Sequence, residues 1–135
     1  MICTHTILKN SKHCPRCFEP IAPLRNELAL QRECKLYFDM NFAGEALLVH
    51  HQNNSETAVG GSKSRALGVR AGIPDFELST SMGRVLYIEI KFGTGRLSKE
   101  QKDMISFLKS MRFETVIART LIEFLTICKT FIAKK

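Results

Sequence analysis

The chain lacks several features that would place it in the membrane or outside the cell. No apolar run approaches the roughly 20 residues that a membrane-spanning helix requires. The N-terminus has no basic stretch followed by an apolar stretch, so we expect no secretory signal. The 5 cysteines are odd in number and irregularly spaced, which argues against a disulfide scaffold. These absences together predict a cytoplasmic protein.

Acidic residues are also scarce relative to basic ones. The chain of 135 residues has 20 lysines and arginines against 13 aspartates and glutamates, which gives a net charge of +7. Such an excess suits a polyanionic partner, because phosphate contacts release counterions. The alternative is that the charge serves solubility alone. With 44% apolar residues, the length fits a single packed domain.

Residues 1–23 differ from the rest of the chain, and we call them the N-terminal extension. They contain three of the four prolines, a density that argues against a long helix. Cys14 and Cys17 form a CxxC pair, a spacing that suits half of a tetrahedral zinc site. Cys3 with either His5 or His13 would supply the remaining ligands. A redox motif is less favoured, because this CxxC does not open a helix after a strand.

The remaining residues, 24–135, have the pattern of one α/β domain. Helical spacing of apolar residues and alternation along strands predict the following order: helix 24–40, strand 46–49, polar loop 52–64, strand 73–79, strand 85–92, helix 98–111, strand 114–119 and helix 121–133. The short connection at 81–84 predicts an antiparallel hairpin, and the next helix acts as a crossover to a parallel strand. The predicted fold is a small mixed central sheet flanked by helices.

Buried faces follow from the same periodicities. Cys34 and Cys128 fall on apolar helix faces and are expected in the core. Ser98 is expected to cap its helix, with Gln101 completing a capping box. In the first predicted helix, the residues at helical spacing are Leu28, Gln31, Cys34 or Lys35, and Phe38. In the hairpin and the later helices, the residues expected to face inward are Leu86, Ile88, Ile90, Met104, Ile105, Leu108, Met111, Leu121, Phe124 and Leu125.

Glu89 and Lys91 are two residues apart on one predicted strand, so their side chains project from the same face. Asp75 lies on the preceding strand of the hairpin and would approach Glu89 if the register allows it. Two close carboxylates repel each other unless a cation lies between them, and oxygen ligands suit Mg²⁺ or Mn²⁺. The alternative is an ordinary exposed strand with mixed charge.

Four short runs occur in an order and spacing that resemble one nuclease family. They are residues 68–75 (GVRAGIPD), 87–91 (YIEIK), 95–101 (GRLSKEQ) and 116–119 (VIAR). Together they resemble the VRR-NUC family of the PD-(D/E)XK nuclease superfamily, over about residues 24–132. The resemblance implies a restriction-endonuclease-like core around the site.

The resemblance also implies a role for each matching position. Asp75 matches the acidic residue of the "PD" pair, and Glu89-Ile90-Lys91 match the "ExK" run. Asp75, Glu89 and the backbone carbonyl of Ile90 would bind the metal, and Lys91 would be the catalytic lysine. Gln101 would lie at the edge of the site, as well as or instead of capping its helix. Glu27 resembles a first-helix glutamate that completes such sites, although it could be a solvated carboxylate.

Small free-standing members of this family are typical of phages and bacteria, and some act on branched DNA as dimers. The resemblance therefore implies DNA as the partner, a homodimer, and the cytoplasm of a bacterial cell or a phage-infected host. The residues expected to contact nucleic acid are His51, Asn53, Asn54, Lys63, Arg65, Arg70 and Arg96, each of which could instead be an ordinary surface residue.

Two functions remain open from the sequence. The first is a metal-dependent endodeoxyribonuclease, with branched DNA or Holliday junctions as its expected substrates. The second is a catalytically inactive, basic nucleic-acid-binding module. The first requires the carboxylates, and the second requires only positive charge. The expected cofactors are Mg²⁺ or Mn²⁺ at the carboxylates and a structural Zn²⁺ at Cys3, His5, Cys14 and Cys17.

Overall fold

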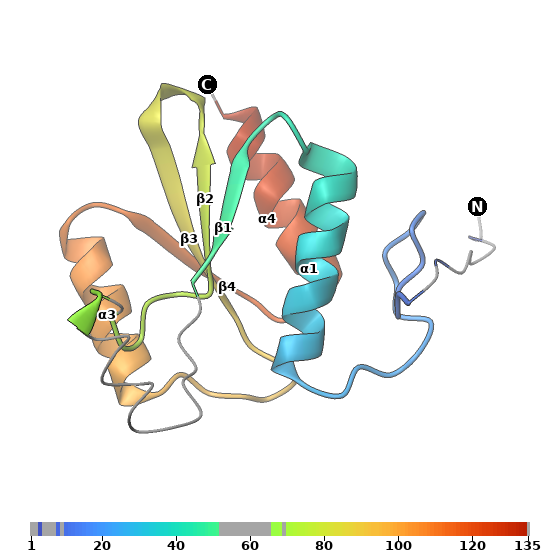
Figure 1. Cartoon of the computed structure of the whole chain (residues 1–135), viewed down its shortest axis with the longest axis horizontal. Helices are drawn as coiled ribbons and strands as arrows, with labels where there is room; N and C mark the ends of the chain where they lie inside the picture. Colours follow the sequence, from blue (N-terminus) through green and yellow to red (C-terminus); the bar gives the residue numbers. More distant parts are fainter. Residues whose placement is uncertain (1–2, 4–7, 9, 52–65, 69, 135) are drawn as a thin grey trace.

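A computed structural model of the chain describes residues 3, 8, 10–51, 66–68 and 70–134. In this part of the chain, four strands form one sheet with α-helices packed on it (Figure 1). The elements in chain order are α1 (Glu27–Phe42), β1 (Leu47–His50), β2 (Phe76–Thr80), the short 3₁₀ turn η1 (Ser81–Gly83), β3 (Arg84–Ile90), α3 (Lys99–Ser110), β4 (Glu114–Ala118) and α4 (Leu121–Ala133). The mixed α/β architecture predicted from the sequence is confirmed.

The strands lie in the order β1-β2-β3-β4. β1 pairs with β2 and β2 with β3 in the antiparallel sense, whereas β3 and β4 are parallel. The η1 turn closes the hairpin between β2 and β3, and Met82 in this turn has a positive φ of 68°. α3 provides the crossover that a parallel β3–β4 pair requires. Both the hairpin and the crossover were predicted.

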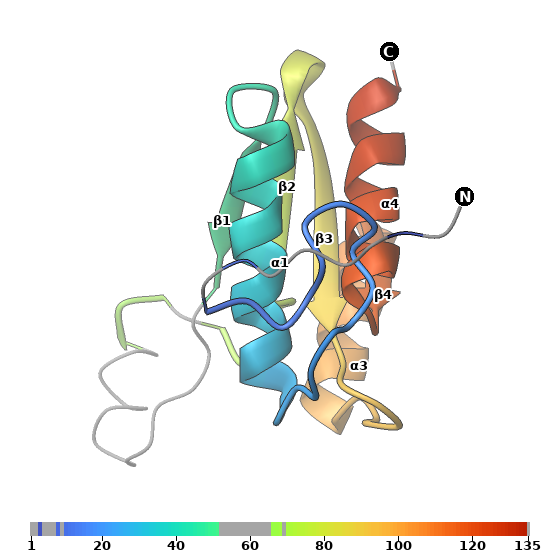
Figure 2. The same cartoon turned by 90° about the vertical axis from the view of Figure 1, so that its right-hand side faces the viewer.

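The helices cover both faces of the sheet. α1 and α4 lie side by side on one face, and α3 lies on the other side (Figures 1 and 2). The main core forms between the sheet and the α1–α4 pair. Its buried residues are Leu30, Cys34, Tyr37, Phe38, Leu48, Phe76, Leu78, Leu86, Ile88, Ile90, Ala118, Leu121, Phe124, Leu125, Cys128 and Phe131. Burying each large apolar side chain contributes roughly 1.5–3 kcal/mol, so this core is the main source of stability.

The helix boundaries follow from their capping residues. The Asn26 side chain accepts a hydrogen bond from the Ala29 amide, so α1 begins at Glu27 rather than at residue 24. Ser98 and Gln101 form the predicted capping box at the start of α3. Thr120 caps α4 by accepting a hydrogen bond from the Glu123 amide.

Two residues on the helical stripes read from the sequence are exposed. Leu28 is 49% exposed, and α1 instead buries a stripe that includes Leu30, Cys34 and Tyr37. Apolar residues are spread around α1 rather than concentrated on one side of it. Contacts with the N-terminal extension and with α4 therefore decide which side is buried. Met111 is 46% exposed, since it caps α3 after the last helical turn and no longer follows the helical spacing.

The burial pattern changes along β3. Its first part alternates between buried and partly exposed residues, as expected of a strand with one covered face. At its end, Glu89, Ile90 and the following Lys91 are all buried, so both faces are covered there. Charged residues are rarely buried unless they are paired, so Glu89 and Lys91 at the end of β3 indicate a candidate functional site.

No helix in the described residues has the length and apolar character needed to cross a membrane.

Candidate metal centre

The register of the hairpin places Asp75 opposite Glu89. Phe76 pairs with Ile88, and one step further along this ladder Asp75 faces Glu89. Asp75 is held by the Ile90 amide, which donates a hydrogen bond of 2.8 Å to Oδ2 of Asp75. Residues that face each other on neighbouring antiparallel strands lie on the same side of the sheet. The approach of the two carboxylates, which the sequence left dependent on register, is thus present in the structure.

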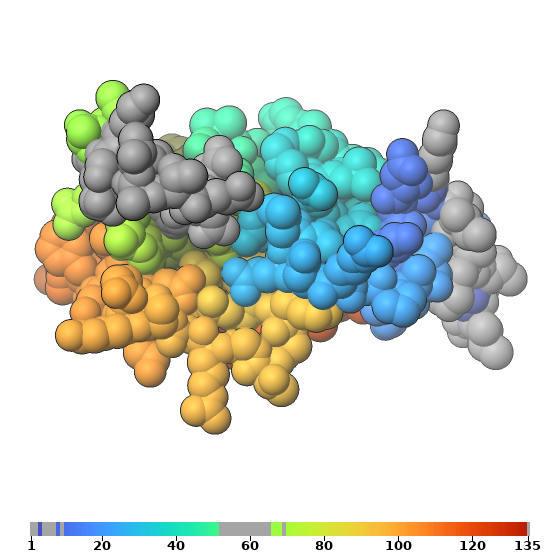
Figure 3. All heavy atoms as spheres, turned by 60° about the horizontal axis from the view of Figure 1, so that its bottom comes forward, coloured from blue at the N-terminus to red at the C-terminus, as the bar shows by residue number. Residues whose placement is uncertain are grey.

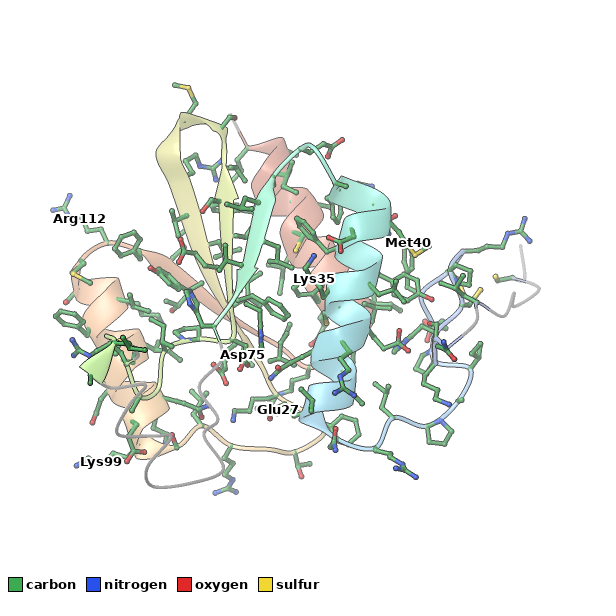
Figure 4. All side chains as sticks on the ribbon, in the orientation of Figure 1. Glu27, Lys35, Met40, Asp75, Lys99 and Arg112 are labelled. Carbon is green, nitrogen blue, oxygen red and sulfur yellow. The ribbon has the colours of Figure 1, made fainter. Side chains whose placement is uncertain are left out.

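A third carboxylate comes from α1. Glu27 is the first residue of that helix, and one carboxylate oxygen each from Glu27, Asp75 and Glu89 lies within 4.8 Å of the others. Figure 4 shows Glu27 at the base of α1 next to Asp75 at the start of β2. The partial positive charge at a helix N-terminus favours a carboxylate at that position. Three elements that are distant in sequence therefore contribute to one acidic cluster.

Lys91 lies beside two of the carboxylates. Its Nζ is 3.8 Å from Oε2 of Glu27 and 3.8 Å from Oε1 of Glu89, and its side chain is only 9% exposed. The Lys91 amide donates to the carbonyl of Ala118, which fixes the end of β3 against β4. One ammonium group therefore accompanies a cluster of three carboxylates, and it does not balance their charge. The cluster would favour an additional cation.

Gln101 connects α3 to this cluster. Its Nε2 donates a hydrogen bond of 2.9 Å to Oε1 of Glu89, while its Oε1 accepts one of 2.8 Å from the Ser98 amide. The two roles left open by the sequence, capping partner and neighbour of the site, thus occur together. The other oxygen of Glu89, Oε2, is buried and receives no hydrogen bond from the residues that the structure describes. A buried carboxylate oxygen without a donor is suited to a cation.

Burial changes the acidity of all three carboxylates. It is the main cause that raises the pKa of Glu89 to about 8, and the charge of Asp75 raises it further. Burial also raises the pKa of Asp75, although the hydrogen bond from the Ile90 amide lowers it. The pKa of Glu27 is raised by burial and lowered by the Lys91 ammonium. Near neutral pH the cluster alone retains a proton, which a divalent cation would displace.

The sequence matches a known family over most of its length. The family model described as the VRR-NUC domain matches residues 22–120, which include all five residues predicted for the catalytic site. This chain belongs to the VRR-NUC family. VRR-NUC is a nuclease-type domain, so membership supports a nuclease function. The Cys-containing part of the N-terminal extension lies outside the matched region.

Comparison of structures agrees on the fold of this VRR-NUC domain. A solved structure described as a VRR_NUC domain protein superposes with a TM-score of 0.63. The two chains are 23% identical, and the match covers 82% of this chain and 91% of the other. At this identity the comparison shows the fold alone. No curated protein matches the sequence.

Three of the residues predicted to contact nucleic acid, His51, Arg70 and Arg96, lie within the described part of the chain. His51 follows β1, and its Nε2 lies 3.1 Å from Oε2 of Glu77 on the neighbouring strand. Arg70 is exposed in the segment before Asp75, and Arg96 is exposed in the segment before α3. Figure 3 shows the face where the start of α1, the segment after β3 and the start of α3 meet. Asn53, Asn54, Lys63 and Arg65 lie outside the described residues.

Two residues that the sequence did not single out position the site. Arg119 donates hydrogen bonds of 2.9 Å to the carbonyls of Gly93 and Gly95, and so holds the turn that follows Lys91. Gly72 has a φ of +79°, and an added Cβ would overlap the backbone carbonyl of Glu100. Arg119 lies in the 116–119 run and Gly72 in the 68–75 run of the family resemblance. Only the three-dimensional contacts show what each residue does. Both residues join loops near the carboxylates to distant elements.

The expected zinc ligands are only partly brought together. The sulfur atoms of Cys3, Cys14 and Cys17 all lie within 4.8 Å of one another. His13 is not part of that group, and its Nδ1 lies 3.6 Å from Oε1 of Glu33 instead. His5 lies outside the described residues. The expected Ile90 carbonyl ligand stays a prediction, because the contact seen at Ile90 is that of its amide.

Proposed function

We propose that this VRR-NUC domain is a divalent-metal-dependent endonuclease that hydrolyses DNA phosphodiester bonds, with the PD-(D/E)XK arrangement of site residues. The observation that supports this most strongly is the convergence of Glu27, Asp75 and Glu89 beside the buried Lys91. Three oxygen ligands of this kind suit Mg²⁺ or Mn²⁺. When bound, such an ion would supply Lewis-acid polarisation of a phosphoryl oxygen and would acidify a water molecule.

Each residue of the chain has a distinct task in this proposal. Asp75, Glu89 and Glu27 would hold the cation, together with the Ile90 carbonyl. Lys91 would orient the attacking water and offset negative charge that develops on the phosphoryl group. Gln101 would keep one oxygen of Glu89 fixed, so that the other is free for the cation.

The test is cleavage of plasmid DNA and of a branched DNA with Mg²⁺ or Mn²⁺. We expect Lys91→Ala and Asp75→Ala each to reduce the cleavage rate by about 100-fold or more, because each removes a group that acts on the transition state. Lys99→Ala is the matched control, since Lys99 is exposed at the start of α3, away from Glu27 and Asp75 (Figure 4). Parental cleavage by both site variants would refute the assignment.

Comparing DNA binding with DNA cleavage for the same proteins distinguishes a nuclease from an inactive binding module. We expect Asp75→Ala to retain DNA binding in a gel-shift assay without divalent metal, since the basic surface is unchanged. A parent that binds DNA but cuts no DNA or RNA substrate with either ion would support the binding module instead. Binding should weaken steeply with salt, because the net charge of +7 favours backbone contacts. A flat salt dependence would count against both functions.

The substrate preference and the assembly state belong to the same proposal. We expect a Holliday junction or a flap to be cut faster than linear duplex DNA, and we expect a homodimer. Parallel assays on these three DNA substrates, with an RNA duplex as comparison, test the first point. Light scattering coupled to size-exclusion chromatography tests the second, and a mass of one chain at working concentration would refute it.

A further inference from the structure

We propose that Cys3, Cys14 and Cys17 bind a structural zinc ion that fixes the N-terminal extension to α1. This site lies outside the matched family region and is independent of the proposed nuclease centre. Its support comes from the arrangement of three sulfur atoms, from the turn that presents two of them, and from the contacts that surround this turn.

The sulfur geometry fits a tetrahedral metal site. The Sγ atoms of Cys3 and Cys14 are 3.8 Å apart, and Cys17 completes a group within 4.8 Å. Four ligands placed tetrahedrally at a Zn–S distance of about 2.3 Å have neighbouring sulfur atoms separated by about 3.8 Å. A disulfide would require about 2.0 Å. The three sulfur atoms are thus spaced for a shared ion rather than for a bond between two of them.

The CxxC segment forms a tight turn. The Phe18 amide donates a hydrogen bond of 2.8 Å to the Cys14 carbonyl, and the Cys14 amide donates one of 3.0 Å to the Glu19 carbonyl. Phe18 has a positive φ of 63°, which reverses the chain directly after Cys17. An isolated bridge between His13 and Pro20 closes the turn. Such a turn directs both cysteines to the same side, as a chelating pair requires.

The rest of the extension is attached to α1 through buried polar groups. The Tyr37 hydroxyl donates a hydrogen bond of 2.7 Å to the His13 carbonyl and lies 2.8 Å from Oγ of Ser11. Glu33 accepts hydrogen bonds from Ser11 and from the Lys12 amide. The Phe18 ring packs edge-on against Tyr37 at 5.8 Å. The sulfur group therefore lies on a segment already placed against the domain.

The N-terminal extension of 23 residues is too short to form a hydrophobic core of its own, so a bound metal is an effective way to stabilise its folded form. Ordering each residue of a chain costs backbone conformational entropy. Structural zinc sites offset such costs, because the folded form binds the ion and the unfolded form does not. The fourth ligand lies outside the group of three; His5, expected from the sequence, is not among the described residues. Loss of zinc should therefore free the turn that contains Cys14 and Cys17.

The first experiment measures zinc in the purified full-length chain by elemental analysis. We expect one zinc per chain that survives dialysis against excess Mg²⁺. Cys14→Ser and Cys17→Ser should lose it, whereas Cys128→Ala, which changes a cysteine buried in the core, should retain it. Asp75→Asn should also retain the zinc. Loss of zinc in this variant would instead assign the ion to the carboxylate cluster. Zinc retained by the double variant at Cys14 and Cys17 would overturn the proposal.

A second measurement does not depend on the folding of any variant. Co²⁺ replaces Zn²⁺ in tetrahedral sites, and we expect the parent chain to show the visible absorption of tetrahedral Co²⁺ with a thiolate charge-transfer band.

Limited proteolysis gives a third test. Arg16 is exposed within the CxxC turn, so trypsin should cut after it only when chelator has removed the metal. An octahedral Co²⁺ spectrum, or equal cleavage at Arg16 with and without zinc, would contradict a metal held by this turn.

Discussion

Cation binding at the carboxylates should depend strongly on pH, because the cation must displace a proton. Burial and the neighbouring Asp75 raise the pKa of Glu89 to about 8, from an ordinary value of 4.5. Only the ionised carboxylate binds the cation. With a pKa of about 8, the ionised fraction is roughly 1% at pH 6 and roughly half at pH 8. The apparent affinity for Mn²⁺ should therefore rise about 50-fold across this interval.

Isothermal titration calorimetry of the full chain with Mn²⁺ measures both the affinity and the proton. Titrations at pH 6.5 in two buffers of different ionisation enthalpy should show the release of about one proton per ion. Glu89→Gln should bind more weakly and lose this pH dependence, since an amide carries no proton to release. Glu114→Gln is the matched control, because its exposed carboxylate lies on β4 outside the cluster. It should retain the full dependence.

The same pKa predicts the opposite trend for the stability of the metal-free protein. A carboxyl group with a raised pKa in the folded state holds its proton more tightly than in the unfolded chain. Stability is therefore highest at low pH with respect to this group, and it falls as pH rises from about 4.5 to about 8. Added Mn²⁺ at pH 8 should restore it. An Mn²⁺ affinity that stays constant between pH 6 and pH 8, with no proton released, would refute the account of Glu89.

Two further predictions concern residues that support the site. Gln101→Glu keeps an oxygen for the helix cap but removes the donor to Glu89 and adds negative charge. Cleavage should fall by about tenfold, and the protein should lose about 1–3 kcal/mol of unfolding stability, because buried Glu89 loses its donor. An unchanged cleavage rate would show that the hydrogen bond is dispensable. Gly72→Ala should destabilise the protein by about 3 kcal/mol in chemical denaturation, because the added Cβ overlaps the start of α3. Gly44→Ala, also at positive φ but with open space around it, should cost only about 1 kcal/mol.

Local sequence signals were sufficient for most of the secondary structure. The alternation along β3 predicted that Leu86, Ile88 and Ile90 face the core, and all three are buried. The capping box of Ser98 and Gln101 identified the start of α3 to the residue. These signals work because hydrogen-bonded caps and strand alternation depend only on near neighbours in the chain.

Signals were weaker where packing partners decide the outcome. In α1 the exposed Leu28 and the buried Glu33 contradict a simple apolar stripe. Glu33 is buried because it accepts hydrogen bonds from the extension, whose course no helical periodicity encodes. Likewise, β2 begins at Phe76 rather than at residue 73, because the Asp75 side chain instead accepts the hydrogen bond from the Ile90 amide.

For the candidate site, the sequence by itself determined which chemical groups are present and that Glu89 and Lys91 share a face of one strand. The tertiary structure decided that Asp75 faces Glu89, that the first turn of α1 brings Glu27 beside them, and that Lys91 is buried between two carboxylates. The physical reason is that strand register and helix placement are set by the packing of the whole core. No local run of residues contains that information.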